Sequence, residues 1–320
     1  MDLEEQTLHY YLKVLNITLI ILFLFSAYIF YILNKNLIIN KNKLIIKKGE
    51  KLENVLNENI NNLSLIDINL VKIYFKITNH FKNNFIHYGE FYIENETTLI
   101  SLLDLISSPS NVFDKITIVE GWSIKQLDLE LSKHYNEFYS IQYNNLIADT
   151  YLIQKNSTFE SLLNKLNNFK NNYFVKYQNN KLFKNFSQDE IMIIGSLLEK
   201  EGLDSNDKKK ISSVILNRLE KNMKLQIDAT VLYAITNGNY NLQRNLLLSD
   251  LKFDHPYNTY LYKGLPPQPI SYVGRKTLDV LFENYETDFL FYFFNKSLNK
   301  HIFSKTYKEH IRKLNEYRKK

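Results

Sequence analysis

The 320-residue chain contains no cysteine, and that absence excludes three kinds of chemistry. Disulfide bonds, zinc sites with thiolate ligands and thiol nucleophiles all require a cysteine side chain. Histidine is also scarce, and none of the seven histidines falls in a metal-ligand spacing such as H-E-x-x-H. We therefore predict no metal site and no cofactor.

Arginine is rare as well, with only five residues, so the formal net charge of +6 comes almost entirely from lysine. A basic chain suggests an anionic partner, such as nucleic acid, a lipid surface or an acidic polymer. Here the lysines accompany frequent asparagine and isoleucine, which indicates a genome-wide bias rather than a binding stripe. The aromatic residues are also spread along the chain. We therefore predict no nucleic-acid binding.

Residues 14–33, VLNITLIILFLFSAYIFYIL, contain no charged side chain. About twenty apolar residues are enough to cross the hydrocarbon core of a membrane as a helix. A cleaved signal peptide would need a shorter apolar core and a cleavage site of small residues, and neither is present. The sequence therefore predicts a short N-terminal tail, residues 1–13, and an uncleaved transmembrane helix, residues 14–33.

The charges that flank this segment bear on its orientation. Lys13 is the only lysine before it, whereas five follow closely: Lys35, Lys41, Lys43, Lys47 and Lys48. An excess of lysine after the span favours a cytoplasmic C-terminal part. Long translocated domains often do not follow this rule, so the lysine pattern alone does not determine the topology.

Two regions with different patterns follow the apolar segment. Residues 44–108 show short strands and amphipathic helices in the order strand, helix, helix, strand, helix, and end at the turn cluster SSPSN. Residues 114–320 form the second region, which opens with a strand, a turn at Gly121 and a helix. Its asparagine- and lysine-rich stretch, residues 164–186, is either a polar helix or a spacer.

The next segment contains three expected helices. Ser187 and Glu190 form a capping box for a helix that ends at Gly202. A second helix spans about residues 207–222, and a third begins at Asp228 as its N-cap. The proline-rich stretch HPYNTYLYKGLPPQPI should be a rigid surface loop. DFLFYFF and HIF are expected to pair as strands before a final basic helix.

Glu201 stands out on the first of these helices. Residues three and four apart share a helix face, so Ile191, Ile194, Leu198 and Glu201 form one stripe, in which only Glu201 is charged. Glu199 points to another face. Glu201 is either a helix-end residue that meets solvent or a carboxyl group desolvated by apolar neighbours. Desolvation raises a carboxyl pKa and keeps the group protonated, as a general acid requires.

Several long motifs occur in a recognisable order. They are GSLLEKEG, VILNRLEKNMKLQIDATVLYAI and YNTYLYKGLPPQPI, with VEGWS, ADTYLI, KGEKLENVL and GEFYI before them and HIFSKTYKEH after them. In this order they closely resemble the MltG (YceG-like) family of endolytic murein transglycosylases. The resemblance covers nearly the whole chain, including the membrane helix.

The resemblance implies an α+β fold class: a single N-terminal transmembrane helix, a small LysM-like α+β module at 44–108 and a mixed α/β catalytic domain at 114–320. It implies a lyase that cuts the MurNAc–GlcNAc bond of nascent peptidoglycan, leaves 1,6-anhydroMurNAc ends and terminates glycan elongation. The protein would sit in the inner membrane, with a cytoplasmic N-terminus, a periplasmic catalytic domain and peptidoglycan synthases as candidate partners.

The same resemblance places the catalytic glutamate at the second Glu of E-K-E, which is Glu201. Tyr257, Asn258 and Thr259 lie on the proline-stiffened loop and are candidates for binding sugar hydroxyls or the N-acetyl group. Four further candidates would bind glycan or brace that loop: Asn217, Arg218, Gln226 and Asp228. A pairing of Arg218 with Asp228 is one way to do so.

Three positions depart from the family pattern. Gly202 replaces the Thr or Ser that usually follows the catalytic glutamate, Ala229 replaces the Pro of D-P-T, and Tyr272–Gly274 replaces an N-P-G turn. None removes a group that the chemistry requires. Two alternatives to the enzyme stay open: an inactive glycan-binding scaffold of the wall-synthesis machinery, with Gly202 as a mark of decay, and a cytoplasmic nucleic-acid binder.

Overall fold

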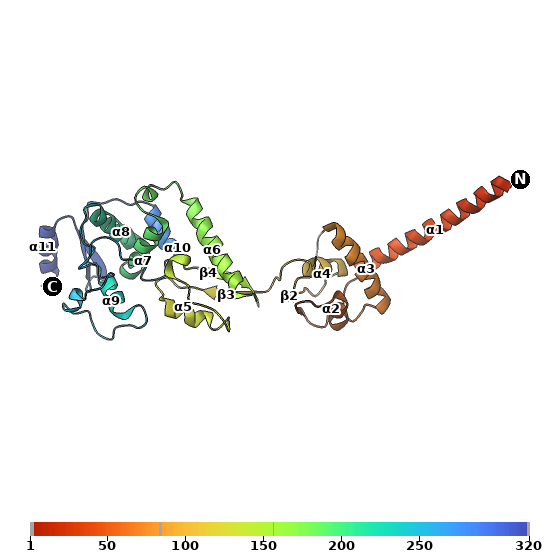
Figure 1. Ribbon diagram of the computed structural model, residues 1–320, viewed down its shortest axis with the longest axis horizontal. Helices are drawn as coiled ribbons and strands as arrows, with labels where there is room; N and C mark the ends of the chain where they lie inside the picture. Colours follow the sequence, from red (N-terminus) through yellow and green to blue (C-terminus); the bar gives the residue numbers. More distant parts are fainter. Residues whose placement is uncertain (1–2, 83–84, 156, 319–320) are drawn as a thin grey trace. The chain divides into compact units, whose positions relative to one another are not determined.

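The computed structural model describes residues 3–82, 85–155 and 157–318, and the chain divides into two compact units. Unit 1 comprises residues 1–114 and 153–157, and unit 2 comprises residues 115–152 and 158–320. Both units mix helices with short two-stranded sheets, so the predicted α+β class is confirmed at this level. Figure 1 shows the elements of each unit along the chain.

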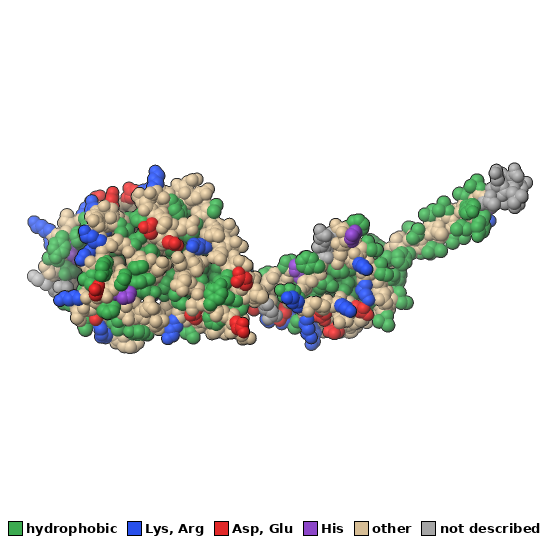
Figure 2. All heavy atoms as spheres, viewed as in Figure 1, with side chains coloured by type: hydrophobic (Ala, Val, Ile, Leu, Met, Phe, Trp, Pro, Cys, Tyr) green, Lys and Arg blue, Asp and Glu red, His purple; other side chains and the backbone are tan. Residues whose placement is uncertain are grey.

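Unit 1 begins with α1 (Leu3–Leu33), whose side chains between residues 8 and 31 are mostly hydrophobic and exposed (Figure 2). Within the described residues, Leu8–Leu33 is the one helix long and apolar enough to cross a membrane by length and composition. Its last residues belong to the folded core, because Ile32 and Leu33 are buried with the rest of the unit. The Tyr28 hydroxyl also donates a hydrogen bond to Asp67 Oδ1 at 2.9 Å.

The remainder of unit 1 follows the strand and helix order expected from the sequence. Its elements are β1 (Lys43–Ile46), α2 (Leu52–Asn59), α3 (Leu65–Lys82), β2 (Gly89–Tyr92) and α4 (Leu99–Ile106). Strands β1 and β2 are antiparallel, with Leu44 opposite Phe91. These two side chains are buried and share the core with the apolar faces of the helices.

Unit 2 is mainly helical. Its helices are α5 (Ile124–Leu131), α6 (Phe159–Lys176), α7 (Gln188–Glu201), α8 (Ser205–Glu220), α9 (Asp228–Thr236), α10 (Arg275–Phe282) and α11 (Tyr307–Arg318). Strand β3 (Phe113–Thr117) pairs with β4 (Thr150–Gln154), and β5 (Phe291–Asn295) pairs antiparallel with β6 (Lys300–Ser304). The β5–β6 pair confirms the expected pairing of DFLFYFF with HIF.

The asparagine- and lysine-rich stretch contains a helix, α6, and is not a spacer throughout. Although most of its residues are polar, Leu162, Leu166, Tyr173 and Phe174 recur at helical spacing and are buried. Tyr173 also donates a hydrogen bond to Asp279 of α10 at 2.8 Å. Tertiary packing of this apolar stripe therefore stabilises a helix that composition alone leaves open.

Helix α7 is the centre of unit 2, and its residues 191–198 are all buried. It packs against α8, α9 and α10, which lie around it in Figure 1. The approach of α10 and the residues before it depends on Gly195, since a Cβ there would lie 2.7 Å from a methyl carbon of Val273 and 3.3 Å from one of Leu278. This close packing holds the C-terminal end of α7 in one position.

Candidate active site

Glu201 is the last residue of α7, and both ends of this helix are well defined. Ser187 and Glu190 form the predicted capping box at the first turn. At the other end, the Gly202 N–H donates to the Leu198 carbonyl at 2.9 Å. Glu201 is therefore carried on a rigid helix that is buried along most of its length.

The carboxyl group of Glu201 is enclosed by protein, although the residue keeps part of its surface exposed. The hydroxyl of Tyr292, on β5, donates a hydrogen bond to Glu201 Oε2 at 3.1 Å. The backbone N–H of Ala229, in the first turn of α9, donates another. Burial is the main influence and raises the pKa of Glu201, whereas these two hydrogen bonds oppose the rise.

A histidine packs against the ring of Tyr292, and an aspartate holds that histidine. The ring of His301, on β6, meets the ring of Tyr292 edge to face at a centroid distance of 5.4 Å. His301 Nδ1 lies 2.8 Å from Asp207 Oδ2, and both side chains are almost completely buried. The positive charge of a protonated His301 would lower the pKa of Glu201. Together these groups fix the hydroxyl of Tyr292 toward Glu201.

Asp228 is the second carboxylate of the site. It was expected to cap α9, but it is the first residue of that helix, and no side chain caps the helix there. Its carboxylate instead accepts a hydrogen bond of 2.6 Å from the Tyr260 hydroxyl. Asp228 is exposed, and its negative charge helps to raise the pKa of Glu201. The site thus holds two carboxylates, each with a tyrosine hydroxyl as donor.

Glu199, the other glutamate of the E-K-E sequence, has a structural role. Its side chain is only 4% exposed and pairs with Lys208 Nζ at 2.5 Å. Its other oxygen accepts the Gly274 N–H, at the start of α10, at 2.9 Å. Glu199 therefore joins α7 to α8 and α10 and does not face Glu201 and its partners.

A cleft of about 660 Å³ borders the site, and it is lined by residues next to Glu201 in sequence or in space, among them Lys200, Asp228 and Ala229. Its other walls come from α5, α9 and the segment 238–246.

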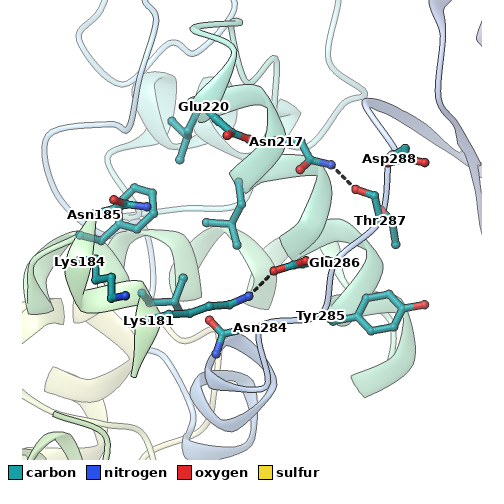
Figure 3. A pocket seen from close by; sticks show the side chains of 14 residues that line it. Lys181, Lys184, Asn185, Asn217, Glu220, Asn284, Tyr285, Glu286, Thr287 and Asp288 are labelled. Atoms are coloured by element: carbon teal, nitrogen blue, oxygen red, sulfur yellow. Dashed lines mark hydrogen bonds and ion pairs between the residues drawn. The ribbon is translucent and has the colours of Figure 1, made fainter. Parts of the chain in front are cut away.

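A larger pocket of about 1070 Å³ lies elsewhere in unit 2 (Figure 3). Some of its polar groups pair with one another, as Lys181 does with Glu286 and Asn217 with the Thr287 carbonyl. The smaller cleft is thus the one that adjoins a perturbed acid.

Among the residues that the structure describes, no cluster of three or more histidine, aspartate or glutamate side chains could hold a metal ion. The side chains of the site can themselves supply proton transfer by Glu201 and charge stabilisation by Asp228.

Comparison with known proteins identifies the family of the chain. A model of the YceG-like family matches residues 44–316. The chain belongs to the YceG-like family. The crystal structure of the yceG-like protein lmo1499 from Listeria monocytogenes has a similar fold, with a TM-score of 0.52 and 22% identity over 86% of this chain and 99% of that one.

Two curated relatives have an assigned activity, and both are named endolytic murein transglycosylase. The Bacillus subtilis (strain 168) protein is 35% identical over 161 residues, which are 50% of this chain and 43% of that protein. The protein of Streptococcus pneumoniae serotype 2 (strain D39 / NCTC 7466) is 29% identical over 174 residues, or 54% and 31%. Each match thus spans less than half of the relative's length.

Gly202, the departure from the YceG-like pattern beside the acid, has a structural reason in this chain. The side chain of Lys208 crosses directly over Gly202 on its way to Glu199 and to the Thr277 hydroxyl. A Cβ at position 202 would collide with the middle of that side chain. The glycine therefore accommodates the buried ion pair, and it does not alter any group that contacts Glu201.

The YNTY segment of the YceG-like loop is more structural than expected. Asn258 and Thr259 are buried, with exposures of 0% and 2%. The Asn258 amide donates to the carbonyls of Leu251 and Phe253, and the Thr259 hydroxyl accepts the Ile227 N–H at 3.0 Å. Both side chains fold the loop and hold it to α9, so the structure does not support direct sugar binding by them.

The side chains of Tyr257 and Gln226 are less buried than those of Asn258 and Thr259. Tyr257 is partly buried and packs on Tyr233 at a ring distance of 4.8 Å, and burial raises its pKa to about 12. Gln226 is exposed in a left-handed conformation, with φ at 51°, and its backbone N–H donates to the Thr259 carbonyl. A left-handed non-glycine residue beside a candidate site is often held there for function. Both residues remain candidates for substrate contact.

Asn217 and Arg218 brace the structure rather than line the cleft. The Asn217 amide donates to the carbonyls of Thr287 and Phe289. Arg218 is 7% exposed and donates to the carbonyls of Leu290 and Leu225 at 2.6 Å each. The suggested ion pair with Asp228 is not among those formed in the described part of the chain. These side chains instead hold the strand that carries Tyr292.

Three residues of the site were not singled out from the sequence: Tyr260, Tyr292 and His301. Tyr260 is the second tyrosine of YNTY, and the other two belong to the strands DFLFYFF and HIF. Alternation along β5 and β6 could have shown which side chains share a face, but not that this face meets α7.

Proposed function

We propose that this protein is a membrane-anchored lytic transglycosylase that cleaves the MurNAc–GlcNAc bond of nascent peptidoglycan strands. The observation that carries the proposal is the enclosed carboxyl group of Glu201, whose pKa burial raises and which Tyr292 and Ala229 orient beside a cleft. The names of the Bacillus and Streptococcus relatives support the same activity.

The reaction uses one carboxyl group twice, first as an acid and then as a base. Protonated Glu201 gives its proton to the glycosidic oxygen as the bond from that oxygen to C1 of MurNAc breaks. Glu201 then takes the proton of the MurNAc C6 hydroxyl, whose oxygen forms the new bond to C1 and closes the 1,6-anhydro ring. Since nucleophile and electrophile belong to one sugar, the closure has the advantage of an intramolecular reaction. No water is consumed.

The neighbours of Glu201 serve the two halves of this cycle. Tyr292 and the Ala229 N–H donate to the carboxylate, so they stabilise it after it has given up its proton. Asp228 places a negative charge near the developing oxocarbenium-like centre, where a second carboxylate supports glycoside cleavage. Tyr260 holds Asp228 in that position.

The membrane anchor is part of the proposal. Helix α1 has the length and composition of a span, and the packing of Ile32 and Leu33 in the core of unit 1 favours a helix that is retained in the mature protein. Since glycan strands exist only outside the cytoplasmic membrane, we place unit 2 on that side, with a cytoplasmic N-terminus. There it would terminate glycan elongation beside peptidoglycan synthases.

Unit 1 beyond α1 is proposed to be a LysM-like glycan-binding module. The β1–α2–α3–β2 order, with an antiparallel strand pair, supports this assignment. A module of this kind would hold the nascent strand near the membrane, where unit 2 cuts it.

Product analysis tests the activity. Purified full-length protein is incubated with glycan strands in water enriched in heavy oxygen, and the new ends are identified by mass spectrometry. We expect only 1,6-anhydro ends, with no heavy oxygen at the cut. Labelled reducing ends would make the protein a hydrolase, and uncut strands that still bind it would identify an inactive glycan-binding scaffold.

Replacing Tyr292 with phenylalanine should shift the pH dependence. Because the Tyr292 hydroxyl bonds to the charged form of Glu201 and lowers its pKa, its loss raises that pKa further. The alkaline limb of the rate profile should therefore move to higher pH, and kcat should fall about tenfold as the carboxylate loses a donor. Steady-state rates across pH measure both effects.

Tyr262→Phe provides the matched control. Tyr262 also donates to a carboxylate, Asp254 Oδ1 at 2.6 Å, but on the exposed loop away from Glu201. This variant should keep the wild-type profile. An unshifted profile in Tyr292→Phe would show that the tyrosine does not act through Glu201.

A further inference from the structure

Helix α3 leaves an apolar face uncovered in unit 1. Ile66, Ile73, Ile77 and Phe81 follow one another at intervals of seven, four and four residues and are 68%, 56%, 55% and 82% exposed. At 100° per residue they fall within an arc of roughly 80° on the helix surface. The buried residues of α3, such as Val71, lie on a different arc. We call this row the outer face of α3. It is a contiguous apolar patch, whereas exposed apolar residues on a soluble surface are usually scattered singly.

The outer face of α3 continues the apolar surface of α1. Figure 1 shows α3 beside the C-terminal end of α1, and the two helices are in contact. Leu70 and Tyr74 of α3 line the same small apolar crevice as Ile29 and Ile32 of α1. Since Leu70 lies one helical turn from both Ile66 and Ile73, no polar residue separates this crevice from the outer face.

The length of the uncharged segment of α1 indicates how deep α3 lies relative to the membrane. Between Lys13 and Lys35 no residue is charged, and an α-helix of that length covers about 30 Å, the thickness of the hydrocarbon core. The last turns of α1, which pack on α3, therefore reach the boundary between acyl chains and headgroups. Tyr28 and Tyr31 also lie there, where tyrosine is enriched in membrane proteins.

We propose that the outer face of α3 docks on the lipid surface at the end of α1. Ile66, Ile73, Ile77 and Phe81 insert at the boundary of headgroups and acyl chains, and the polar face of the helix stays in water. Residues 35–82 carry nine lysines and four acidic residues, an excess that favours anionic headgroups. The inference rests on the proposed membrane anchoring, and it gives unit 1 a second point of attachment that prevents rotation about α1.

The absence of cysteine makes the test direct, because each single-cysteine variant of the full-length chain carries one label. Ile77→Cys and Phe81→Cys are labelled with a polarity-sensitive fluorophore and reconstituted into phosphatidylcholine–phosphatidylglycerol vesicles that contain shallow nitroxide lipids. The matched control is Lys76→Cys, which is also exposed but lies on the polar face. Leu22→Cys reports on α1 itself. It is labelled in the same way and reconstituted into vesicles whose lipids carry nitroxides deep in the acyl chains.

We expect quenching at positions 77 and 81 to be about twofold or more stronger than at position 76, together with a blue-shifted emission. Equal, weak quenching at the three positions, with strong deep quenching at position 22, would overturn the docking of α3 and keep the anchor. Shielding at position 77 that grows with the protein-to-lipid ratio, together with disulfide-linked dimers of the unlabelled Ile77→Cys variant, would make the face an interface between copies. Absence of quenching at position 22 would remove the anchor and the inference with it.

Glycan cleavage by the same labelled proteins is measured separately. Loss of docking with cleavage intact would contradict only this inference. Docking without any cleavage would instead contradict the proposed enzymatic activity.

Discussion

Replacing Glu201 with glutamine is expected to abolish glycan cleavage while leaving the protein folded. Glutamine keeps the shape of the side chain and its carbonyl oxygen can still accept from Tyr292, but it has no acidic proton to give to the glycosidic oxygen. Loss of a general acid costs about 100- to 10,000-fold in rate, and here the same group also serves as the base. The appearance of 1,6-anhydro ends measures the loss.

The same variant should have a distinctive stability profile. Because burial raises the pKa of Glu201, the folded wild type binds more protons than the unfolded chain between the unfolded and the folded pKa. The free energy of unfolding of the wild type therefore falls as pH rises through that range. Glu201→Gln lacks the titrating group, so its stability relative to the wild type should increase with pH. Thermal unfolding at several pH values tests this sign.

Glu199→Gln is the matched control, since it makes the same chemical change two residues away. Removal of one charge from the buried pair with Lys208 should cost about 3–5 kcal/mol of stability. The folded fraction should still cut glycan at close to the wild-type rate. If Glu199→Gln were stable but inactive and Glu201→Gln active, the catalytic assignment would pass to Glu199.

A local pattern in the sequence was enough to make Glu201 a candidate for the acid. Positions three and four apart on α7 set the stripe that ends in Glu201, and the capping box of Ser187 and Glu190 set where the helix begins. The burial of α7 then encloses the carboxyl group at its end. This pattern left open whether Glu201 meets solvent, and the resemblance to the YceG-like family selected it as the proposed acid.

The partners of Glu201 could not be predicted in the same way. Tyr292 lies 91 residues farther along the chain, and only the folded position of β5 brings its hydroxyl to Glu201. For Asn258 and Thr259, the sequence indicated a loop but not whether their polar groups face solvent or the loop's own backbone. Asp228 was expected at a helix cap, and its contact with Tyr260 depends on how that loop folds back on α9.

Replacing Asp228 with asparagine is expected to lower kcat on the order of 100-fold, since loss of one preorganised electrostatic group costs about that much. Asparagine keeps the size of the side chain and removes the charge that would stabilise the oxocarbenium-like centre. A second effect has a definite sign. The negative charge of Asp228 raises the pKa of Glu201, so its removal should move the alkaline limb of the rate profile to lower pH.

Tyr260→Phe separates the charge of Asp228 from its position. This variant keeps the carboxylate but removes the hydroxyl that donates to Asp228 Oδ1 at 2.6 Å, so kcat should fall less than in Asp228→Asn. An Asp228→Asn variant with unchanged kcat and a raised KM would make Asp228 a substrate-binding residue only. Heavy oxygen in wild-type products that disappears in this variant would show that Asp228 activates water. In that case two carboxylates, and not Glu201 alone, would carry the reaction.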